Sequence, residues 1–252
     1  MSRIFRTTVS HSILIWGVLL MIVPLWLVFA SSTHSNSFIY NEGMQWKIGG
    51  EFFENYDRVL NRKGGFTKEI TASGIFYNSF IMAFGIASLS VFVSMMAAYS
   101  LVYFKTRFST LFFWLIFITL LVPLELRILP SYQIVSDLNL LNSYAGLILP
   151  LSASAIATFF FRQYYRSIPE ELLEAAKLDG ANSWKFFIDF LVPLSKTMVA
   201  AMFIFMFVYG YNQYLWPLIM TTSEKYWTVV MGLKMIYGGN SVDRYTYVIL
   251  SL

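Results

Sequence analysis

Two charged residues, Glu125 and Arg127, stand in an otherwise apolar stretch that begins at Pro123 and ends at Pro130. At membrane depth an ionisable side chain left in lipid costs several kcal/mol, so both residues are candidates for a functional role. Arg127 is then the candidate for a side chain that faces a translocation path. The alternative, that both side chains reach the membrane surface, stays open. The two prolines argue against one unbroken helix here.

A second group of polar side chains follows between residues 209 and 217. Its candidates for a solute pathway are Tyr211, Asn212, Gln213 and Trp216. Amide side chains at membrane depth need hydrogen-bond partners, and aromatic rings beside them would suit a polyhydroxylated solute. An interfacial belt of aromatic residues, with amides bonded across helices, explains the same pattern equally well.

The chain lacks the residue patterns of an enzyme. It has no glycine-rich phosphate loop followed by Lys-Ser/Thr, so it cannot hydrolyse ATP by that route. It has no cysteine, and its two histidines, His11 and His34, have neither zinc-site nor catalytic-triad spacing. We therefore expect no catalytic residue, no metal site and no cofactor bound by this chain. Any ATP-driven step must use a partner protein.

The composition indicates a membrane protein. Of the 252 residues, 57% are hydrophobic and 13% are charged, whereas soluble domains average about 25% charged residues. The formal net charge of +4 fits basic flanks of membrane spans, because no basic run is interleaved with aromatic residues as in nucleic-acid-binding proteins. We therefore expect contact with the lipid bilayer and no binding of nucleic acid.

Windows without charged residues locate the membrane spans, since a span needs about 20 apolar residues. They predict an all-α, polytopic protein with spans near residues 13–30, 76–104, 108–124, 144–161 and 198–220. A sixth span begins at residue 245 and is incomplete at Leu252, where the sequence stops. The first window could instead be a signal peptide, but its apolar part is longer than the usual length of about 7–15 residues, which favours a retained span.

Basic residues indicate how the spans are oriented. Arg3 and Arg6 precede the first span, and Lys105 and Arg107 follow the second, in both cases without accompanying acids. By the positive-inside rule the N-terminus and the second-to-third connection lie in the cytoplasm. The segment of residues 167–193 then lies on the cytoplasmic side as well.

Two segments are expected on the outer side. Residues 31–73 carry apolar side chains at helical spacing, namely Phe52, Phe53, Tyr56, Val59 and Leu60. This pattern predicts a short amphipathic helix, which either packs on the protein or the membrane surface or contacts an extracytoplasmic partner. Residues 223–244 are interpreted as a polar outer loop.

The second span carries two sets of small residues spaced four apart, Ala83 with Ala87, and Ser90 with Ser94 and Ala98. Such faces let helices approach closely where hydrophobicity cannot drive their association. We therefore expect close helix packing here, with pore lining as the alternative. The fourth span is also rich in small and hydroxyl residues, from Ser152 to Thr158.

Residues 167–193 form the one long charged segment between two apolar blocks, so this segment must face water. Ser167 followed by Glu170 fits a capping box, and Pro169 suits the first turn of a short helix. Gly180 can take a positive φ and stop that helix. Leu172, Ala175 and Ala176 lie on one face of this first helix.

A second short helix is expected after the glycine. Asn182 or Ser183 can cap it, and Pro193 ends it before the next apolar block. The segment thus consists of two short helices that meet at an angle in water, between two membrane spans. Such an arrangement is typical of an element that docks onto a partner protein.

This segment resembles the EAA loop of membrane subunits from binding-protein-dependent ATP-binding-cassette importers. The resemblance is carried by Glu174-Ala175-Ala176, by Gly180 after three further residues, and by Pro193. The family pattern closes with Ile, any residue, Leu and Pro, where this chain has Phe-Leu-Val-Pro at residues 190–193. The two departures, Phe190 in place of Ile and Val192 in place of Leu, are conservative.

In that family the loop inserts into a cleft of the ATPase subunit, where its glutamate pairs with a basic residue. The resemblance therefore implies that ATPase coupling depends on Glu174, Ala175, Ala176, Asp179, Gly180 and Pro193. It implies a six-span permease fold in the bacterial cytoplasmic membrane. It also implies a heterodimer with a second permease subunit, two ATP-binding subunits that use ATP and Mg, and an extracytoplasmic solute-binding protein.

Most of the chain resembles the subfamily of the second membrane subunit of maltose importers. Within it, residues 112–119, 123–128, 142–146, 157–163 and 193–197 are most similar to the second permease subunits of glycerol-3-phosphate importers. This resemblance implies transport of sn-glycerol-3-phosphate or glycerophosphodiesters by alternating access, with a di- or oligosaccharide as the alternative.

Two other classes of function make different demands on the sequence. A secondary transporter would need internal repeats with broken helices at matching positions, and neither is evident in the chain. A membrane-embedded enzyme would need acids, bases or metal ligands that converge inside the spans, and Glu125 alone is insufficient.

Overall fold

The computed structural model describes residues 3–61, 70–104 and 106–238 of the chain. These residues form helices and connecting loops, and no strand occurs in the part described. The all-α prediction is confirmed. A helix satisfies its backbone N–H and C=O groups within one segment, which is the requirement that lipid places on an apolar chain.

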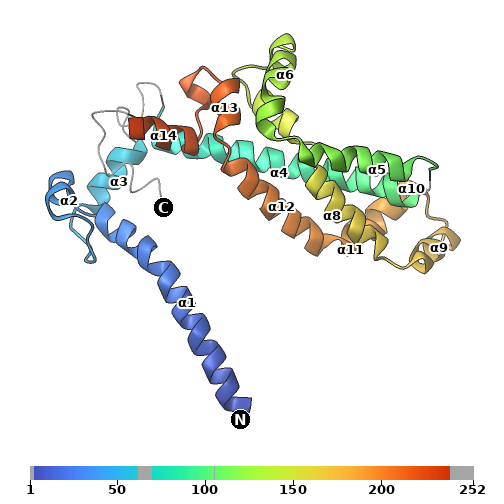
Figure 1. Ribbon diagram of the computed structural model, residues 1–252, viewed down its shortest axis with the longest axis horizontal. Helices are drawn as coiled ribbons and strands as arrows, with labels where there is room; N and C mark the ends of the chain where they lie inside the picture. The colour runs from blue at the N-terminus through green and yellow to red at the C-terminus, as the bar shows by residue number, and fades with distance from the viewer. Residues whose placement is uncertain (1–2, 62–69, 105, 239–252) are drawn as a thin grey trace. The chain divides into compact units, whose positions relative to one another are not determined.

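The longer elements are labelled as in Figure 1. The helices are α1 (Arg3–Ser32), α2 (Asn36–Glu42), α3 (Phe52–Asn61), α4 (Ala72–Tyr103), α5 (Ser109–Ile118), α6 (Leu124–Asp137), α7 (Tyr144–Ile148), α8 (Ala155–Arg166), α9 (Glu170–Leu178), α10 (Ser183–Lys185), α11 (Val192–Leu194), α12 (Lys196–Tyr211), α13 (Leu215–Met220) and α14 (Val229–Gly238). Three 3₁₀ turns, η1 (Thr119–Leu121), η2 (Leu149–Leu151) and η4 (Glu224–Tyr226), and one π-helix, η3 (Phe186–Leu191), connect them. The chain divides into two compact units, Met1–Phe76 with Met231–Leu252, and Tyr77–Val230.

Two helical stretches are long and apolar enough to cross a membrane, Thr7–Ser32 and Ala72–Tyr103. Three bent pairs of helices also qualify if each pair counts as one span. The pairs are Ser109–Leu121 with Leu124–Asp137, Tyr144–Leu151 with Ala155–Arg166, and Ser183–Leu194 with Lys196–Tyr211, bent by 104°, 46° and 76°. The described residues therefore hold between two and five candidate spans. The sixth expected span, from residue 245, lies outside them.

In the first unit, α1 leads into a small folded region that contains α2 and α3. Asn55, buried on α3, donates hydrogen bonds to the carbonyl oxygens of Ser32 and His34 at 3.0 and 2.9 Å. Thr33 Oγ1 accepts the backbone N–H of Gly49 at 2.6 Å. The two Asn55 bonds satisfy carbonyl groups at and just after the C-terminal end of α1, where no further helical turn can do so.

The expected amphipathic helix is confirmed as α3. Val59 is buried, and Phe52, Tyr56 and Leu60 are half-buried on the same face. Phe53 departs from the expectation, because 84% of its surface is exposed.

In the second unit, the small residues of α4 form a tightly packed seam. Ala83, Ala87, Ser90, Ser94 and Ala98 are all fully buried. Ser90 Oγ donates to Leu151 O at 3.4 Å, and Ser94 Oγ donates to Ser154 O at 3.1 Å. The prediction of close packing is confirmed, since these hydroxyl groups bond α4 to backbone carbonyls at the bend between Leu151 and Ala155.

Two clusters of buried side chains surround α4. The aromatic cluster comprises Val91, Met95, Ala98, Tyr99, Ala157, Phe161, Tyr165, Ala176, Phe186, Phe187, Leu191 and Met202. The methionine cluster comprises Met82, Ile86, Ala87, Ile128, Val135, Leu147, Leu151, Met206, Trp216 and Met220. Figure 1 shows α8, α9 and α11 near the end of α4 that finishes at Tyr103, where the aromatic cluster lies.

Two expectations about local structure hold only in part. The helix is broken at Pro123, where the chain bends by 104° before α6, but Pro130 lies inside α6, which continues to Asp137. A proline within a helix removes one backbone donor, and the remaining hydrogen bonds suffice here. Residues 223–244 are not simply a loop, because η4 and α14 occupy part of them and Val229 and Met231 are buried.

Candidate functional site

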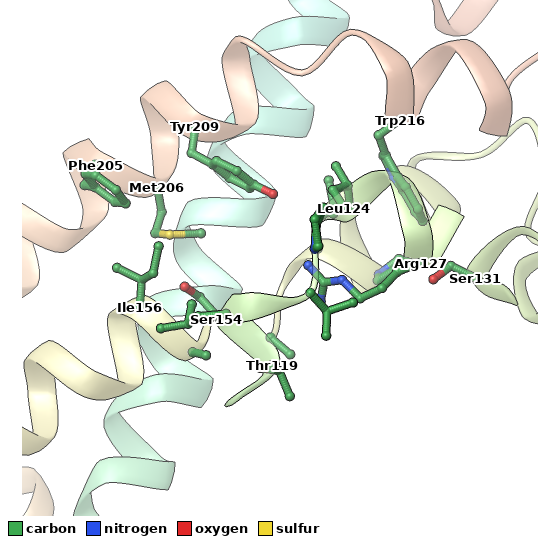
Figure 2. Close-up of a pocket in the computed structure, with 17 residues that line it drawn as sticks. Thr119, Leu124, Arg127, Ser131, Ser154, Ile156, Phe205, Met206, Tyr209 and Trp216 are labelled. Atoms are coloured by element: carbon green, nitrogen blue, oxygen red, sulfur yellow. The ribbon is translucent and has the colours of Figure 1, made fainter. Parts of the chain in front are cut away.

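A cavity of about 320 Å³ opens where α6, α8 and α12 meet in the second unit (Figure 2). Its polar lining residues are Thr119, Arg127, Ser131, Ser154, Tyr209 and Trp216, and the remaining lining residues are apolar. A concave, largely apolar site with a few polar groups has the general character of a small-molecule site.

Interrupted helices form the walls of this cavity. The chain bends by 104° between Leu121 and Leu124 and by 46° between Leu151 and Ala155. Ser154 caps the second half of the latter pair, because its Oγ accepts the N–H of Ala157 at 3.2 Å. Non-helical backbone at membrane depth is tolerated where it is buried in protein or lines a cavity. The break between Leu151 and Ala155 therefore places the Ser154 hydroxyl group at the wall of the cavity.

Among the described residues that line the cavity, Arg127 is the only charged one. It extends from the first turn of α6, and no carboxylate of the described residues lies within 4.0 Å of its guanidinium. Figure 2 shows this guanidinium and the Tyr209 hydroxyl turned toward the space between α6 and α12. The cavity thus offers a positive charge and a hydroxyl group to an anionic, hydroxylated solute.

The structure brings together two of the six predicted pathway residues, Arg127 and Trp216. Trp216 is 1% exposed, and its Nε1–H donates to Leu147 O at 3.1 Å, so its indole is also a structural anchor. Glu125, in the first turn of α6, is exposed and is not among the lining residues.

The other predicted pathway residues, Tyr211, Asn212 and Gln213, are also absent from the lining. The ring of Tyr211 stacks on Phe207 with centroids 6.1 Å apart. Asn212 Nδ2 donates to Val208 O at 2.9 Å, and Gln213 Nε2 donates to the carbonyl oxygen four residues earlier at 3.2 Å. The amides thus bond to their own helix end, where carbonyl groups lack helical partners.

Four polar lining residues were not predicted. Tyr209 belongs to the same aromatic group as the predicted residues, and Ser154 lies in the hydroxyl-rich run, so both had a local signal. Thr119 and Ser131 had none, because only the bend between η1 and α6 brings them to the cavity.

The charged segment of residues 167–193 contains α9, α10, η3 and α11. The predicted capping box is wrong, because Ser167 ends α8 instead. Its N–H and Oγ both donate to Tyr164 O, at 3.0 and 2.6 Å. Pro169 is the N-cap of α9 and lies just outside its first turn, with no side-chain cap.

The predicted end of α9 is confirmed. Gly180 has φ +75° and its N–H donates to Lys177 O at 3.0 Å. The N–H of Ala181 donates to Ala176 O at 2.9 Å, which completes a Schellman-type end. Asn182 then caps α10 as expected, with its Oδ1 accepting the N–H of Lys185 at 2.8 Å.

The packed face of α9 differs from the expected one. Ala176 is buried and Leu173 packs against the aromatic cluster, whereas Ala175 is exposed. Glu174 is exposed as well, and no cation of the described residues lies within 4.0 Å of its carboxylate.

Two large apolar side chains near the α9–α10 turn also face solvent. Leu178 is 89% exposed and Trp184 is 55% exposed. Both side chains belong to the charged segment of residues 167–193.

The second helical segment ends one residue after the expected position, Pro193. This proline is inside α11, which continues the π-helix η3, and the chain bends by 76° after Leu194. The N–H of Val192 donates to Phe187 O, five residues back. This wider turn comes just before Pro193, which has no N–H to donate. The helical segment therefore continues through the proline to Leu194. Asp179, another predicted coupling residue, is the exposed C-cap of α9.

Comparison with protein families gives a match over residues 90–250 to the family described as "Binding-protein-dependent transport system inner membrane component". The matched region contains both the cavity and the charged segment.

Similar proteins span nearly the whole chain. The sn-glycerol-3-phosphate transport system permease protein UgpE of Escherichia coli (strain K12) is 41% identical over 252 residues, which cover 100% of this chain and 89% of that protein. The protein of the same name from Yersinia pestis bv. Antiqua (strain Antiqua) is 44% identical over 225 residues, which cover 89% and 79% of the two chains.

A solved structure shares the fold. It is the crystal structure of a bacterial ATP-binding-cassette transporter involved in the import of the acidic polysaccharide alginate. The TM-score is 0.78 at 23% sequence identity, and the match covers 100% of this chain and 93% of the other.

Proposed function

Because this chain belongs to the family of binding-protein-dependent transport system inner membrane components, we propose that it forms half of the solute pathway of an ATP-driven importer. As a permease subunit it is not catalytic, and ATP hydrolysis belongs to a partner ATPase. Its place is the inner membrane of a bacterium.

The proposed assembly has one copy of this chain and a second permease subunit, two ATP-binding subunits that use ATP and Mg, and an extracytoplasmic solute-binding protein. Residues 1–252 act as one multi-pass permease domain with a cytoplasmic N-terminus. Its spans are near residues 13–30, 76–104, 108–124, 144–161 and 198–220, and a sixth starts at 245. The five charge-free windows and the basic residues that flank the first two support this arrangement.

Residues 167–193 are proposed as the cytoplasmic coupling loop. Glu174, Ala175, Ala176, Asp179, Gly180 and Pro193 are the residues assigned to ATPase coupling. The exposed carboxylate of Glu174 and the exposed side chains of Leu178 and Trp184 support a protein partner on this surface. The buried side of α9 joins the aromatic cluster, so motion imposed on α9 is transmitted to α4 and α8.

The proposed solute is sn-glycerol-3-phosphate or a related glycerophosphodiester. The observation that carries this proposal is an arginine without an acidic partner in the cavity of a chain 41% identical to a glycerol-3-phosphate permease over its whole length. A guanidinium and a phosphate can pair through two parallel hydrogen bonds. The Tyr209 and Ser154 hydroxyl groups, on the other walls, suit the glycerol part.

Glu125, Tyr211, Asn212 and Gln213 do not line the cavity in this structure. We assign them to the solute pathway only in a different conformational state. Transport by alternating access requires at least two states, and ATP binding favours one of them. The bends at residues 122–123, 152–154 and 195 supply positions where helices can move as separate pieces. Arg127 and Trp216 are the pathway residues that the cavity itself supports.

Uptake of labelled solute into vesicles that contain the complete transporter tests the proposal. We expect concentrative, ATP-dependent uptake of sn-glycerol-3-phosphate. Arg127→Gln should lower this uptake at least about tenfold, since a hydrogen bond to a charged group contributes about 1.5–3 kcal/mol. Arg107→Gln, which removes an exposed charge outside the cavity, is the matched control. Uptake of a di- or oligosaccharide in place of the phosphate ester, or full uptake by Arg127→Gln, would contradict the assignment.

A further inference from the structure

A second cavity, of about 310 Å³, lies in the same unit at the end of α4, beside α8 and the start of α9. It shares no lining residue with the first cavity. Its ionisable lining residues are Arg162, Arg166, Glu170, Tyr103 and Tyr165.

Two guanidinium groups from one helix face line this cavity. Arg162 and Arg166 are four residues apart on α8, a spacing that brings like charges close enough to repel. The Arg162 guanidinium lies over the ring of buried Phe113, with its carbon 3.8 Å from the ring centroid. This stacking fixes the plane of the guanidinium.

The hydrogen-bonding capacity of these arginines is not used by the described residues. Arg162 Nε is buried and has no hydrogen-bond partner among them. Neither arginine forms an ion pair within 4.0 Å in the part of the chain that the structure describes. Two positively charged groups with unused hydrogen-bond donors favour an anion that can accept several hydrogen bonds.

We propose that this second cavity binds a phosphate group, held by Arg162 and Arg166. The charge balance supports a phosphate, because two guanidinium groups face one carboxylate, that of Glu170. The phosphate can belong to the headgroup of an anionic lipid or to a soluble phosphate. Basic cavities between membrane helices on the cytoplasmic side bind lipid headgroups by the same chemistry.

The position of the cavity gives the bound phosphate a regulatory role. Ile168, Glu170 and Leu173 line it and belong to α9 or to its connection with α8. A phosphate held by α8 therefore restrains the start of the proposed coupling helix. The binding itself does not depend on which solute is transported, so it can be tested separately from the proposed function.

The test uses the purified transporter complex in nanodiscs of two compositions, phosphatidylcholine alone and phosphatidylcholine with phosphatidylglycerol. Thermal unfolding is measured with potassium phosphate and with potassium chloride at equal ionic strength, and bound lipid is measured by native mass spectrometry. A ligand that binds only the folded state raises the unfolding midpoint. We expect the phosphate group to raise the midpoint of the wild type and of the control Arg107→Gln.

Arg166→Gln and the double variant Arg162→Gln/Arg166→Gln should lose this rise, whereas Arg166→Lys should keep part of it. A free phosphate is the ligand if the rise occurs with potassium phosphate in both membranes. A lipid is the ligand if phosphatidylglycerol is retained at least about twofold better by the wild type than by Arg166→Gln. No difference between the salts and no selective lipid retention, or a full response in the double variant, would overturn the proposal.

Discussion

The two clusters that pack α4 differ in the kind of side chain they use. The aromatic cluster places Tyr99, Phe161, Tyr165, Phe186 and Phe187 next to the charged segment. The methionine cluster, beside the cavity with Arg127, is built mainly from methionine and aliphatic side chains around Trp216.

This difference fits the proposed function of each region. Aromatic rings pack with defined geometry, so under that proposal they would pass a displacement of α9 on to α4 and α8. Methionine is flexible and fills irregular space. Met206 of this cluster lines the cavity, so its side chain can adjust if the cavity changes shape. Under the proposed function, the comparison distinguishes a rigid region next to the coupling loop from an adaptable region next to the solute cavity.

The largest effect is expected where the stiff region meets the charged segment. Gly180→Val places a branched side chain at φ +75°, which costs about 1–2 kcal/mol locally and disturbs the turn between α9 and α10. We expect ATP-driven uptake to fall more than about tenfold, since a small misplacement of a coupled element has large kinetic effects. Uptake and ATP hydrolysis by the complete transporter are measured together.

Gly43→Val is the matched control, because Gly43 has the same φ of +75° and no atom within 4 Å of an added Cβ, as is true of Gly180. With its ψ of −163°, Gly43 lies in a backbone region that is essentially restricted to glycine, so the substitution there also introduces backbone strain, but outside the charged segment. Equal losses in the two variants would show that strain alone, rather than coupling, explains the effect.

Removing a ring from the aromatic cluster should have the next largest effect. Phe161 is fully buried, and Phe161→Ala should lower the free energy of unfolding by about 3–5 kcal/mol, because it leaves a cavity that rigid neighbours cannot fill. Thermal unfolding of the purified protein measures this. A loss no larger than that of a methionine-cluster variant would remove the distinction between the regions.

The crossing of α4 and α12 gives an intermediate prediction. A Cβ on Gly210 would lie 3.1 Å from Cα of Ala83, so Gly210→Ala forces two backbones apart. We expect a loss of about 1–3 kcal/mol in stability. Gly17→Ala on α1 is the control, since nothing lies within 4 Å of the added Cβ there. Unfolding midpoints of the two variants should differ clearly, and equal midpoints would argue against close packing.

The smallest effect is expected in the methionine cluster. Met82 is 1% exposed on α4, and Met82→Leu should cost less than about 1.5 kcal/mol, because the swap conserves volume and the neighbours can adjust. Thermal unfolding with uptake as a second readout provides the check. A severe loss of stability would mean that this cluster is as tightly specified as the aromatic one.

The sequence predicted those parts of the structure that depend on neighbouring residues. Charge-free windows predicted helical segments, Gly180 and Asn182 predicted a helix end and a cap, and the small residues of α4 predicted a packed seam. In each case the signal and its structural consequence lie within a few residues of each other.

The failures share a different cause. Ser167 could either end α8 or cap the start of α9. Its hydroxyl group donates to Tyr164 O, so it ends α8. Thr119 and Ser131 reach the cavity only through a bend of 104°, and the pairing of Asn212 and Gln213 with their own helix end depends on where that helix stops. Such tertiary outcomes are not encoded in local spacing.

The π-helix η3 fixes the length of the segment between Asn182 and the bend after Leu194. A π turn holds one residue more than the α-helical repeat would use. Deleting a single residue from Phe186–Leu191 would let the ladder revert to ordinary register and rotate everything before it by about 100°. Such a frame-preserving deletion would turn the outward surface of α9 away from its partner without altering any residue on that surface.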